Sequence, residues 1–238
     1  MFLHTHPYEP FFFKGATKLI VGTLPPPRFT TGDLKDGDVD FCYGSRDGQL
    51  WPILDRIFNL NLKFETTEEA IRQRMDFLRN RKIGICDIVE SAERSKVDAS
   101  DLGMHNIKLR NLIYHLQQYP NVHTLLFTGG NSKNGPEYFF RKHLKEHGIP
   151  LKVVSDLVPR IHQFMMPADL SDISNGNRKA TEKSVGLKSR TIKTVSLTAP
   201  SGAANRAVGS LPAYQKLKNT NPDFNTLDFR EMQYRPFF

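Results

Sequence analysis

The sequence is poor in cysteine and in long apolar runs. Only two of its 238 residues are cysteines, Cys42 and Cys86, which is too few for a four-thiolate zinc site or a cysteine-held iron–sulfur cluster. Because a disulfide framework and a signal-peptide pattern are both missing, we expect a cytoplasmic protein. No stretch approaches the roughly 20 apolar residues that cross a bilayer, so we expect no membrane partner.

Motifs of several common enzyme classes are also missing. The chain has no Gly-x-Gly-x-x-Gly and no Gly-x4-Gly-Lys-Ser/Thr, which argues against the nucleotide-binding folds that use such loops. A His-Glu-x-x-His motif is absent and the eight histidines are scattered, so no metal is predicted. The lack of Gly-x-Ser-x-Gly leaves a serine hydrolase without support.

Positive charge is what the sequence has in excess. Its formal charge is +8 and its pI about 9.5, while 39% hydrophobic and 11% aromatic residues suffice for a folded core. Lysines and arginines that neutralise phosphates release counterions, so such a surface favours nucleic acid as a partner. The alternative, that the charge only keeps the protein soluble, stays open.

Apolar runs alternate with amphipathic segments along the chain. This alternation predicts βαβ units, and hence a mainly parallel sheet with helices on both faces in one domain over residues 1–238. The expected strands are 18–22, 83–89, 122–127, 151–154 and 192–197. The expected helices are 51–60, 66–81, a helix capped by Asn106, 136–148 and 211–217.

One segment, residues 167–190, interrupts the alternation. It is polar and lacks periodicity, so we expect a flexible basic loop. A solvated loop and a DNA-clamping loop are both open at this point. Its basic residues are Arg178, Lys179, Lys183, Lys188 and Arg190.

Polar loops follow the expected strands. In a parallel sheet ligands bind beyond the carboxyl ends of the strands, so these loops should converge on one crevice. The loop from Tyr43 to Trp51 mixes aromatic residues with Arg46 and Asp47 and leads into a helix. A carboxylate there can stabilise a cationic sugar or orient water, but Asp47 can equally be a helix cap.

Five segments, in order between about Lys18 and Lys218, resemble motifs of the uracil-DNA glycosylase superfamily. The likeness is closest to its mismatch-specific uracil/thymine and hypoxanthine-DNA glycosylase branches. The segments are Leu19-Ile20-Val21-Gly22-Thr23-Leu24-Pro25-Pro26, Tyr43-Gly44-Ser45-Arg46-Asp47-Gly48-Gln49-Leu50-Trp51, Gly84-Ile85-Cys86-Asp87-Ile88-Val89, Leu125-Leu126-Phe127-Thr128-Gly129-Gly130-Asn131 and Ala199-Pro200-Ser201-Gly202.

The resemblance implies a three-layer α/β/α domain with a four-stranded parallel sheet, with room for a fifth strand. It implies a monofunctional DNA repair enzyme that flips a damaged base, such as uracil or hypoxanthine, and hydrolyses its N-glycosidic bond. No metal or other cofactor is implied. The expected partner is double-stranded or mismatched DNA, and the expected state is a monomer.

The resemblance also implies roles for individual residues. Asp47 would be the catalytic residue that positions water, and Tyr43 would stack on the flipped base. The other base-binding residues would be Gly22, Thr23, Leu24, Thr128 and Asn131. The DNA-binding residues would be Ser201, Gly202, Arg206 and Arg46, with Arg206 in the minor groove.

Two positions depart from the family pattern. Leu24 stands where the first motif usually has Asp or Asn, and Ala199 stands where the second usually has His or Asn. Two alternatives therefore stay open. The chain could be a catalytically weak or inactive DNA-binding member of the same fold, or a nucleoside hydrolase built on the same sheet.

Overall fold

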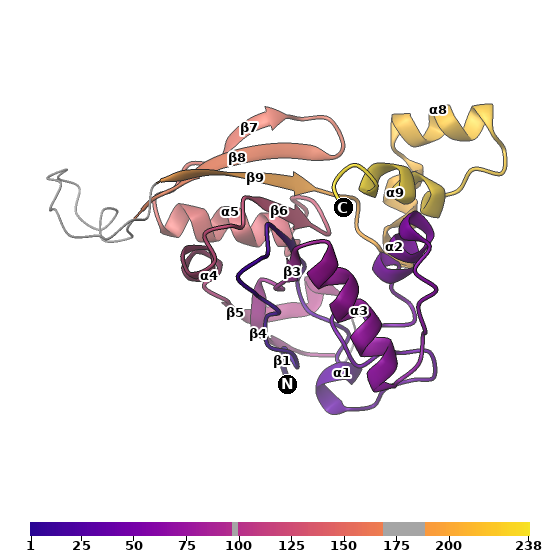
Figure 1. The fold of residues 1–238 in the computed structure, drawn as a ribbon, viewed down its shortest axis with the longest axis horizontal. Coiled ribbons are helices and arrows are strands. Elements are labelled where there is room, and N and C mark those ends of the chain that lie inside the picture. The colour runs from indigo at the N-terminus through magenta and orange to yellow at the C-terminus, as the bar shows by residue number, and fades with distance from the viewer. Residues whose placement is uncertain (97–99, 169–188) are drawn as a thin grey trace, which may run out of the picture.

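A computed structural model describes residues 1–96, 100–168 and 189–238. Its main feature is a six-stranded sheet in the order β3-β2-β6-β9-β8-β7 (Figure 1). The strands are β3 (Ile83–Ile85), β2 (Lys18–Val21), β6 (Thr124–Phe127), β9 (Arg190–Ser196), β8 (Arg160–Met166) and β7 (Lys152–Ser155). The first four run parallel, whereas β8 runs against both of its neighbours. The expected α/β class with a mainly parallel sheet is confirmed. Strands β8 and β7 extend the four parallel strands to six.

Helices flank this sheet, and local sequence signals account for several of their ends. The Thr67 hydroxyl caps α3 by accepting the Ala70 N–H at 3.3 Å, and Pro136 begins α5, where a missing N–H is tolerated. The helices are α1 (Arg28–Thr31), α2 (Leu50–Phe58), α3 (Glu68–Asn80), α4 (Leu112–Gln118), α5 (Pro136–Glu146), α7 (Asn205–Gly209), α8 (Pro212–Thr220) and α9 (Thr226–Tyr234), with short 3-10 turns at Asp101–Gly103 and Gly202–Ala204.

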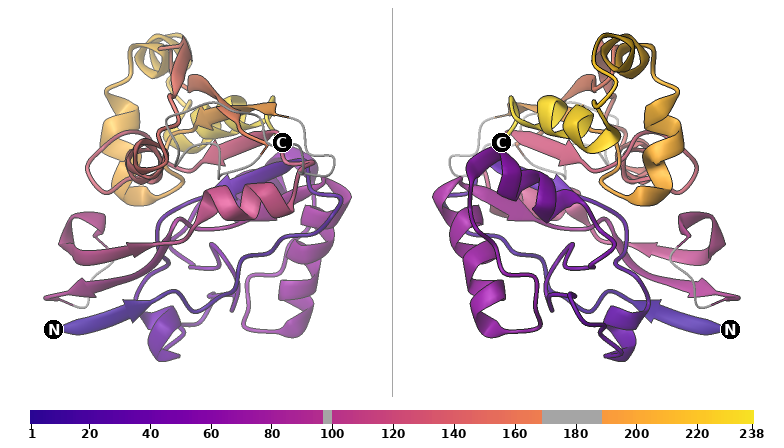
Figure 2. Two further views of the ribbon diagram at one scale, coloured as in Figure 1. Left: turned by 90° about the vertical axis from the view of Figure 1, so that its left-hand side faces the viewer. Right: turned by 90° about the vertical axis from the view of Figure 1, so that its right-hand side faces the viewer.

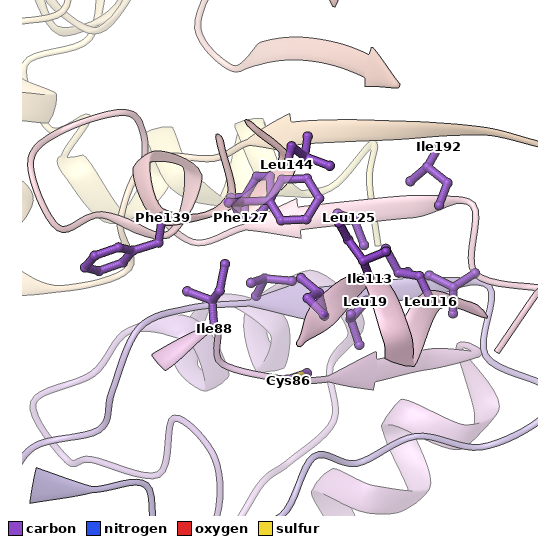
Figure 3. Close-up of a cluster of buried hydrophobic side chains, with 14 of the residues drawn as sticks. Leu19, Cys86, Ile88, Ile113, Leu116, Leu125, Phe127, Phe139, Leu144 and Ile192 are labelled. Carbon is purple, nitrogen blue, oxygen red and sulfur yellow. The ribbon is translucent and has the colours of Figure 1, made fainter. Parts of the chain in front are cut away.

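Successive side chains of β2 and β6 point to opposite faces of the sheet. Leu19 and Leu125 join a buried cluster with residues of α4 and α5 (Figure 3). Ile20 and Leu126 join a second buried cluster with residues of α2 and α3 and with Tyr234 of α9. Because each face of the sheet carries its own apolar cluster and helices, the arrangement has three layers, α/β/α.

A second sheet takes up the start of the helix that was expected from Asn106, and the helix itself begins only at Leu112. β1 (Phe2–Thr5), β4 (Val89–Arg94) and β5 (Met104–Leu109) form an antiparallel sheet in the order β1-β4-β5. Asn106 lies inside β5, and Asn111 caps α4 instead by accepting the Tyr114 N–H at 3.0 Å. The expected strand 83–89 correspondingly ends at Ile85, and Val89 begins β4. The local pattern was overridden by strand pairing. Figure 2 shows this sheet at the opposite end of the molecule from α8.

Residues 169–188, most of the loop expected at 167–190, lie outside the described residues, and with them Arg178, Lys179, Lys183 and Lys188. Arg190 is described, and it begins β9 and donates to the carbonyl of Leu116. Within the described ranges, no helix combines the length and the apolar character that a membrane span requires.

Candidate functional site

Two adjoining cavities open at the carboxyl ends of the parallel strands. The larger, here called the cleft, has a volume of about 420 Å³ and lies among the segments 23–28, 43–48 and 199–203 together with Asp87. The smaller, here called the side cavity, has a volume of about 360 Å³ and extends toward α5 and α7. Thr23, Asp101, Thr128 and Ala199 line both cavities. The loops expected to converge therefore do so.

One wall of the cleft is built on the missing side chain of Gly22. A Cβ at Gly22 would lie 2.1 Å from the Tyr43 hydroxyl oxygen and 2.7 Å from Asp87 Oδ1. Tyr43 has a left-handed backbone with φ of 59°, uncommon for an aromatic residue, and its hydroxyl lies 2.9 Å from Thr128 Oγ1. Gly22 is therefore needed for the tyrosine to reach across the end of the sheet.

Asp87 is buried under this wall with both carboxylate oxygens engaged. Oδ1 accepts the Gly22 N–H at 3.0 Å, and Oδ2 lies 3.0 Å from His6 Nε2. His6 Nδ1 accepts the Tyr8 N–H at 3.1 Å, so the hydrogen that His6 gives to Asp87 sits on Nε2 of a neutral ring. Burial, with the Asp87 charge adding to it, raises the pKa of Tyr43 well above its usual value. Tyr43 is thus a neutral phenol that can donate a hydrogen bond.

A second carboxylate, Asp101, lines both cavities. Its Oδ1 accepts the Thr23 hydroxyl at 3.0 Å, and its backbone carbonyl accepts the Asn134 side-chain amide at 2.8 Å. Burial raises the pKa of Asp101 to about 6, against the opposing effects of the Thr23 hydrogen bond and the Arg94 charge. The carboxyl therefore changes its charge near neutral pH.

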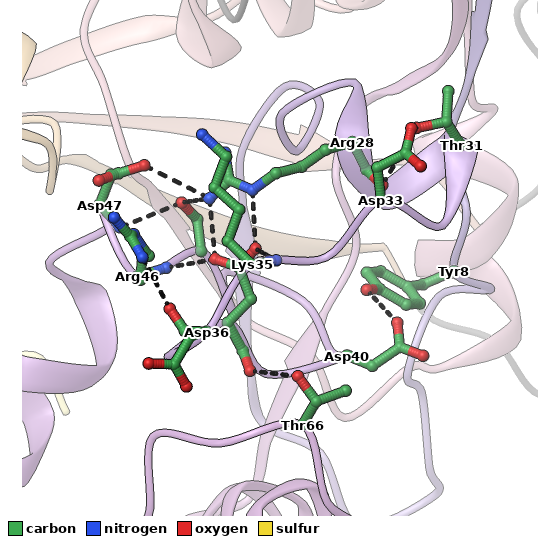
Figure 4. A network of polar contacts seen from close by, with 12 residues as sticks. Tyr8, Arg28, Thr31, Asp33, Lys35, Asp36, Asp40, Arg46, Asp47 and Thr66 are labelled. Carbon is green, nitrogen blue, oxygen red and sulfur yellow. Dashed lines mark hydrogen bonds and ion pairs between the residues drawn. The ribbon is translucent and has the colours of Figure 1, made fainter.

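Arg28 holds the loop that carries Asp47 (Figure 4). Its guanidinium donates to both oxygens of the buried Asp38, at 2.7 and 2.8 Å, and to Ser45 Oγ at 2.8 Å. Burial would raise the pKa of Asp38, but the Arg28 hydrogen bonds and two backbone N–H groups outweigh it and lower the pKa to about 2. This ion pair keeps its charge throughout the physiological range and fixes the cleft side of the loop.

Asp47 lies on the rim of the cleft. Its side chain is 70% exposed, and it forms an ion pair with Arg28 Nη2 at 3.4 Å. Arg46 beside it is exposed, and its guanidinium donates to the Asp36 carbonyl at 3.0 Å. Water surrounds the Asp47 carboxylate, so its charge acts on the cleft through a high dielectric.

Arg230 of α9 ties the two cleft loops together from behind. Its fully buried guanidinium donates to the Ala199 carbonyl at 2.8 Å, the Gln49 side chain at 2.9 Å and the Ser201 carbonyl at 3.1 Å. The Gln49 N–H also donates to the Pro200 carbonyl at 2.8 Å. The segments 43–49 and 199–203 therefore form one rigid unit.

The remaining sequence-predicted residues divide into two groups. Thr23, Leu24, Thr128, Ser201 and Gly202 line the cleft together with Tyr43 and Asp47. Asn131 and Arg206 are exposed and line neither cavity, and Asn134, three residues after Asn131, is the amide that reaches the site. Arg46 also lines neither cavity, so the structure brings most of the predicted set together and leaves Arg46, Asn131 and Arg206 outside it.

Four residues at the site had no assigned role from the sequence. Asp87 was detectable, because it lies in the third of the segments that resemble glycosylase motifs. Arg28 lies just past the proline-rich turn, where a basic residue is unremarkable. Asp101 and Arg230 reach the site through the β4–β5 sheet and α9, and no local motif marks either of them.

Metal-ligating residues are not clustered in the described part of the chain. No group of three or more His, Cys, Asp or Glu side chains there is arranged to hold a metal ion. Both cysteines are buried and unpaired, and burial raises the pKa of Cys86 to about 12.

Comparison with known proteins gives little beyond this geometry. No family model matches the chain, and no curated protein matches it. The solution NMR structure of a "putative Uracil DNA glycosylase" from Methanosarcina acetivorans is similar, with a TM-score of 0.44 and 14% identity over 62% of this chain and 80% of that chain. A likeness at this level carries no functional conclusion.

Arg230→Ala should lower the free energy of unfolding by at least about 3 kcal/mol, because several buried carbonyl and amide acceptors lose their donor. Chemical denaturation measures this. Arg235→Ala, at the C-terminal cap of the same helix but exposed and paired with Glu231, is the matched control and should change stability by less than about 0.5 kcal/mol. Equal effects in the two variants would contradict the clamping role.

Proposed function

We propose that this chain is a DNA N-glycosylase, which receives a flipped base in the cleft and hydrolyses its N-glycosidic bond. The observation that carries the proposal is that all five segments resembling glycosylase motifs contribute to, or underlie, the cleft. They are far apart in the sequence, between Leu19 and Gly202, and the parallel sheet gathers them at one edge. The excess of positive charge supports a polyanionic substrate.

The chemistry of the cleft suits this reaction. Breaking the bond leaves an oxocarbenium-like sugar and a base that departs with the electron pair, so the site needs negative charge near the sugar and donors near the base. Asp47, Asp87 and Asp101 supply carboxylates, and Arg28 is the guanidinium that lines the cleft. Tyr43 offers an aromatic face for stacking, and the Thr128 hydroxyl can read a polar base edge.

Neither Leu24 nor Ala199 offers a polar side chain to the cleft that both line. Water positioning and contact with the base must therefore come from neighbouring groups. The substrate class that fits is a base that leaves readily once flipped, such as uracil or hypoxanthine. Flipping is easiest at mismatched or damaged pairs, so weak pairing contributes to selection.

The DNA backbone is proposed to lie against Ser201 and Gly202. Both line the cleft, and a Cβ on Gly202 would meet no protein atom within 4 Å, so a phosphate can approach the main chain closely. Arg46 and Arg206 are exposed next to these cleft loops and are proposed to contact phosphates or the minor groove.

The decisive experiment uses labelled duplexes that each carry one uracil, hypoxanthine or mismatched thymine, followed by hot alkali to cut abasic sites. We expect cleavage at the lesion of at least one duplex. Salt-sensitive duplex binding without any abasic product would instead indicate the inactive DNA-binding member. Hydrolysis of free nucleosides without duplex binding would indicate the nucleoside hydrolase.

Asp47→Asn tests the role that the sequence assigned to Asp47. Because the side chain is exposed and its charge is screened, we expect single-turnover base release to fall by less than about tenfold, with duplex binding retained. A loss of a hundredfold or more would make Asp47 the principal carboxylate of the reaction.

Gly202→Ala tests the proposed phosphate contact. The added methyl group is free of protein contacts, so it should leave folding intact but obstruct the backbone of DNA, and we expect duplex affinity to fall about three- to tenfold. Gly209→Ala is the matched control, because a Cβ there also meets nothing within 4 Å and Gly209 lines neither cavity. Equal dissociation constants for the two variants would remove the contact.

A further inference from the structure

Asp101 has a position that no other acidic residue of the described chain shares. It is the acidic residue among the four side chains that line both the cleft and the side cavity. The other three are Thr23, Thr128 and Ala199. A group in this wall can therefore contact one molecule in the cleft and another in the side cavity at the same time.

The orientation of Asp101 is fixed from two sides. The Thr23 hydroxyl donates to Oδ1 at 3.0 Å, and the Asn134 amide donates to the backbone carbonyl at 2.8 Å. Oδ2 accepts no hydrogen bond from the described residues, so it has capacity for a water molecule. Asp87, by contrast, already accepts hydrogen bonds at both oxygens, and Asp47 lies exposed on the rim.

The groups that face Asp101 set its charge. Burial disfavours the anion and Asp87 adds like-charge repulsion, whereas the Thr23 hydroxyl and the Arg94 guanidinium favour the anion, and together they place the pKa near 6. Because the pKa is raised, Asp101 is a carboxylate above about pH 6 and becomes protonated below it. A general base is most effective when its pKa lies near the operating pH.

We infer that Asp101 is the general base of the reaction, taking a proton from a water molecule that approaches through the side cavity while the flipped base occupies the cleft. This inference rests on the proposed glycosylase function. The water oxygen bonds to the sugar C1′, its proton passes to Asp101 Oδ2, and the C1′–N bond breaks with its electron pair leaving on the base. The departing base or solvent then takes the proton from Asp101. The polar group missing at Leu24 is thus replaced by a carboxylate tethered to its neighbour, Thr23.

Asp101→Asn should lower single-turnover base release by about 10²- to 10⁴-fold with duplex affinity unchanged. The wild-type rate should fall on acidification through about pH 6, and this acid limb should vanish in the variant. Asp76→Asn, the same chemical change on the exposed surface of α3, is the matched control and should keep the wild-type rate and profile. A full rate with an intact acid limb in Asp101→Asn overturns the inference.

Thr23→Val gives a second readout that does not depend on removing the carboxyl. It deletes the hydroxyl that stabilises the anion, so the pKa of Asp101 should rise and the acid limb of the profile should move to higher pH, whatever the rate on the plateau above it. An unshifted limb overturns the inference, even if Asp101→Asn is inactive or unfolded. Failure of the wild-type protein to release any base is a different result, which removes the proposed function itself.

Discussion

Tyr43 approaches the main chain at Gly22 so closely that no other residue than glycine fits there. That contact brings the tyrosine hydroxyl to Thr128 at the end of β6 and sets its ring along the cleft. It also leaves the Gly22 N–H free to bind Asp87. A side chain at Gly22 would separate the loop 43–48 from the sheet, and the cleft would lose the wall that gives it both an aromatic face and a buried carboxylate.

The carboxylates around this wall differ because their surroundings differ. Asp38 is paired with Arg28 and two backbone N–H groups, and its pKa falls to about 2. Asp101 is half-buried with one hydroxyl donor, and desolvation raises its pKa to about 6. Acid and base roles arise where environments push the pKa values of neighbouring groups apart. One carboxylate therefore serves as a permanent structural charge, while the other can exchange a proton near neutral pH.

The parallel strands were predictable because each contains a short run of residues that is buried on both faces of the sheet. Leu19 and Leu125 mark one face and Ile20 and Leu126 the other, and the polar residues that follow them had to meet at one edge. Strand β8 was missed because the sequence Arg160–Met166 mixes charged and apolar residues. Its extended conformation is stabilised by pairing with β9 and β7, which local sequence does not reveal. Asn106 was misassigned because its segment pairs with β4, which local periodicity does not reveal.

The position of the site in the fold was easier to predict from the sequence than the residues that form it. Motif segments locate loops, and Tyr43, Thr23 and Ser201 all line the cleft. Asp101 and Arg230 could not be found in this way, because each reaches the cleft from an element whose position is set by tertiary packing. Asn131 shows the reverse case: Thr128 of its segment lines the cleft, but Asn131 itself is exposed, and Asn134 is the residue that donates to the Asp101 carbonyl.

Leu24 and Ala199 show why the place of the site could be predicted more readily than its residues. Other groups supply the polar contacts beside these two positions. Next to Leu24, the Thr23 hydroxyl donates to Asp101. At Ala199, the backbone carbonyl accepts a hydrogen bond from Arg230. The fold fixes the wall, and different side chains along it can present a carboxylate to the same space. A chain can therefore lose the polar residues of its motifs and keep the charge that the chemistry needs, provided that the strands and loops still bring a substitute to the cleft.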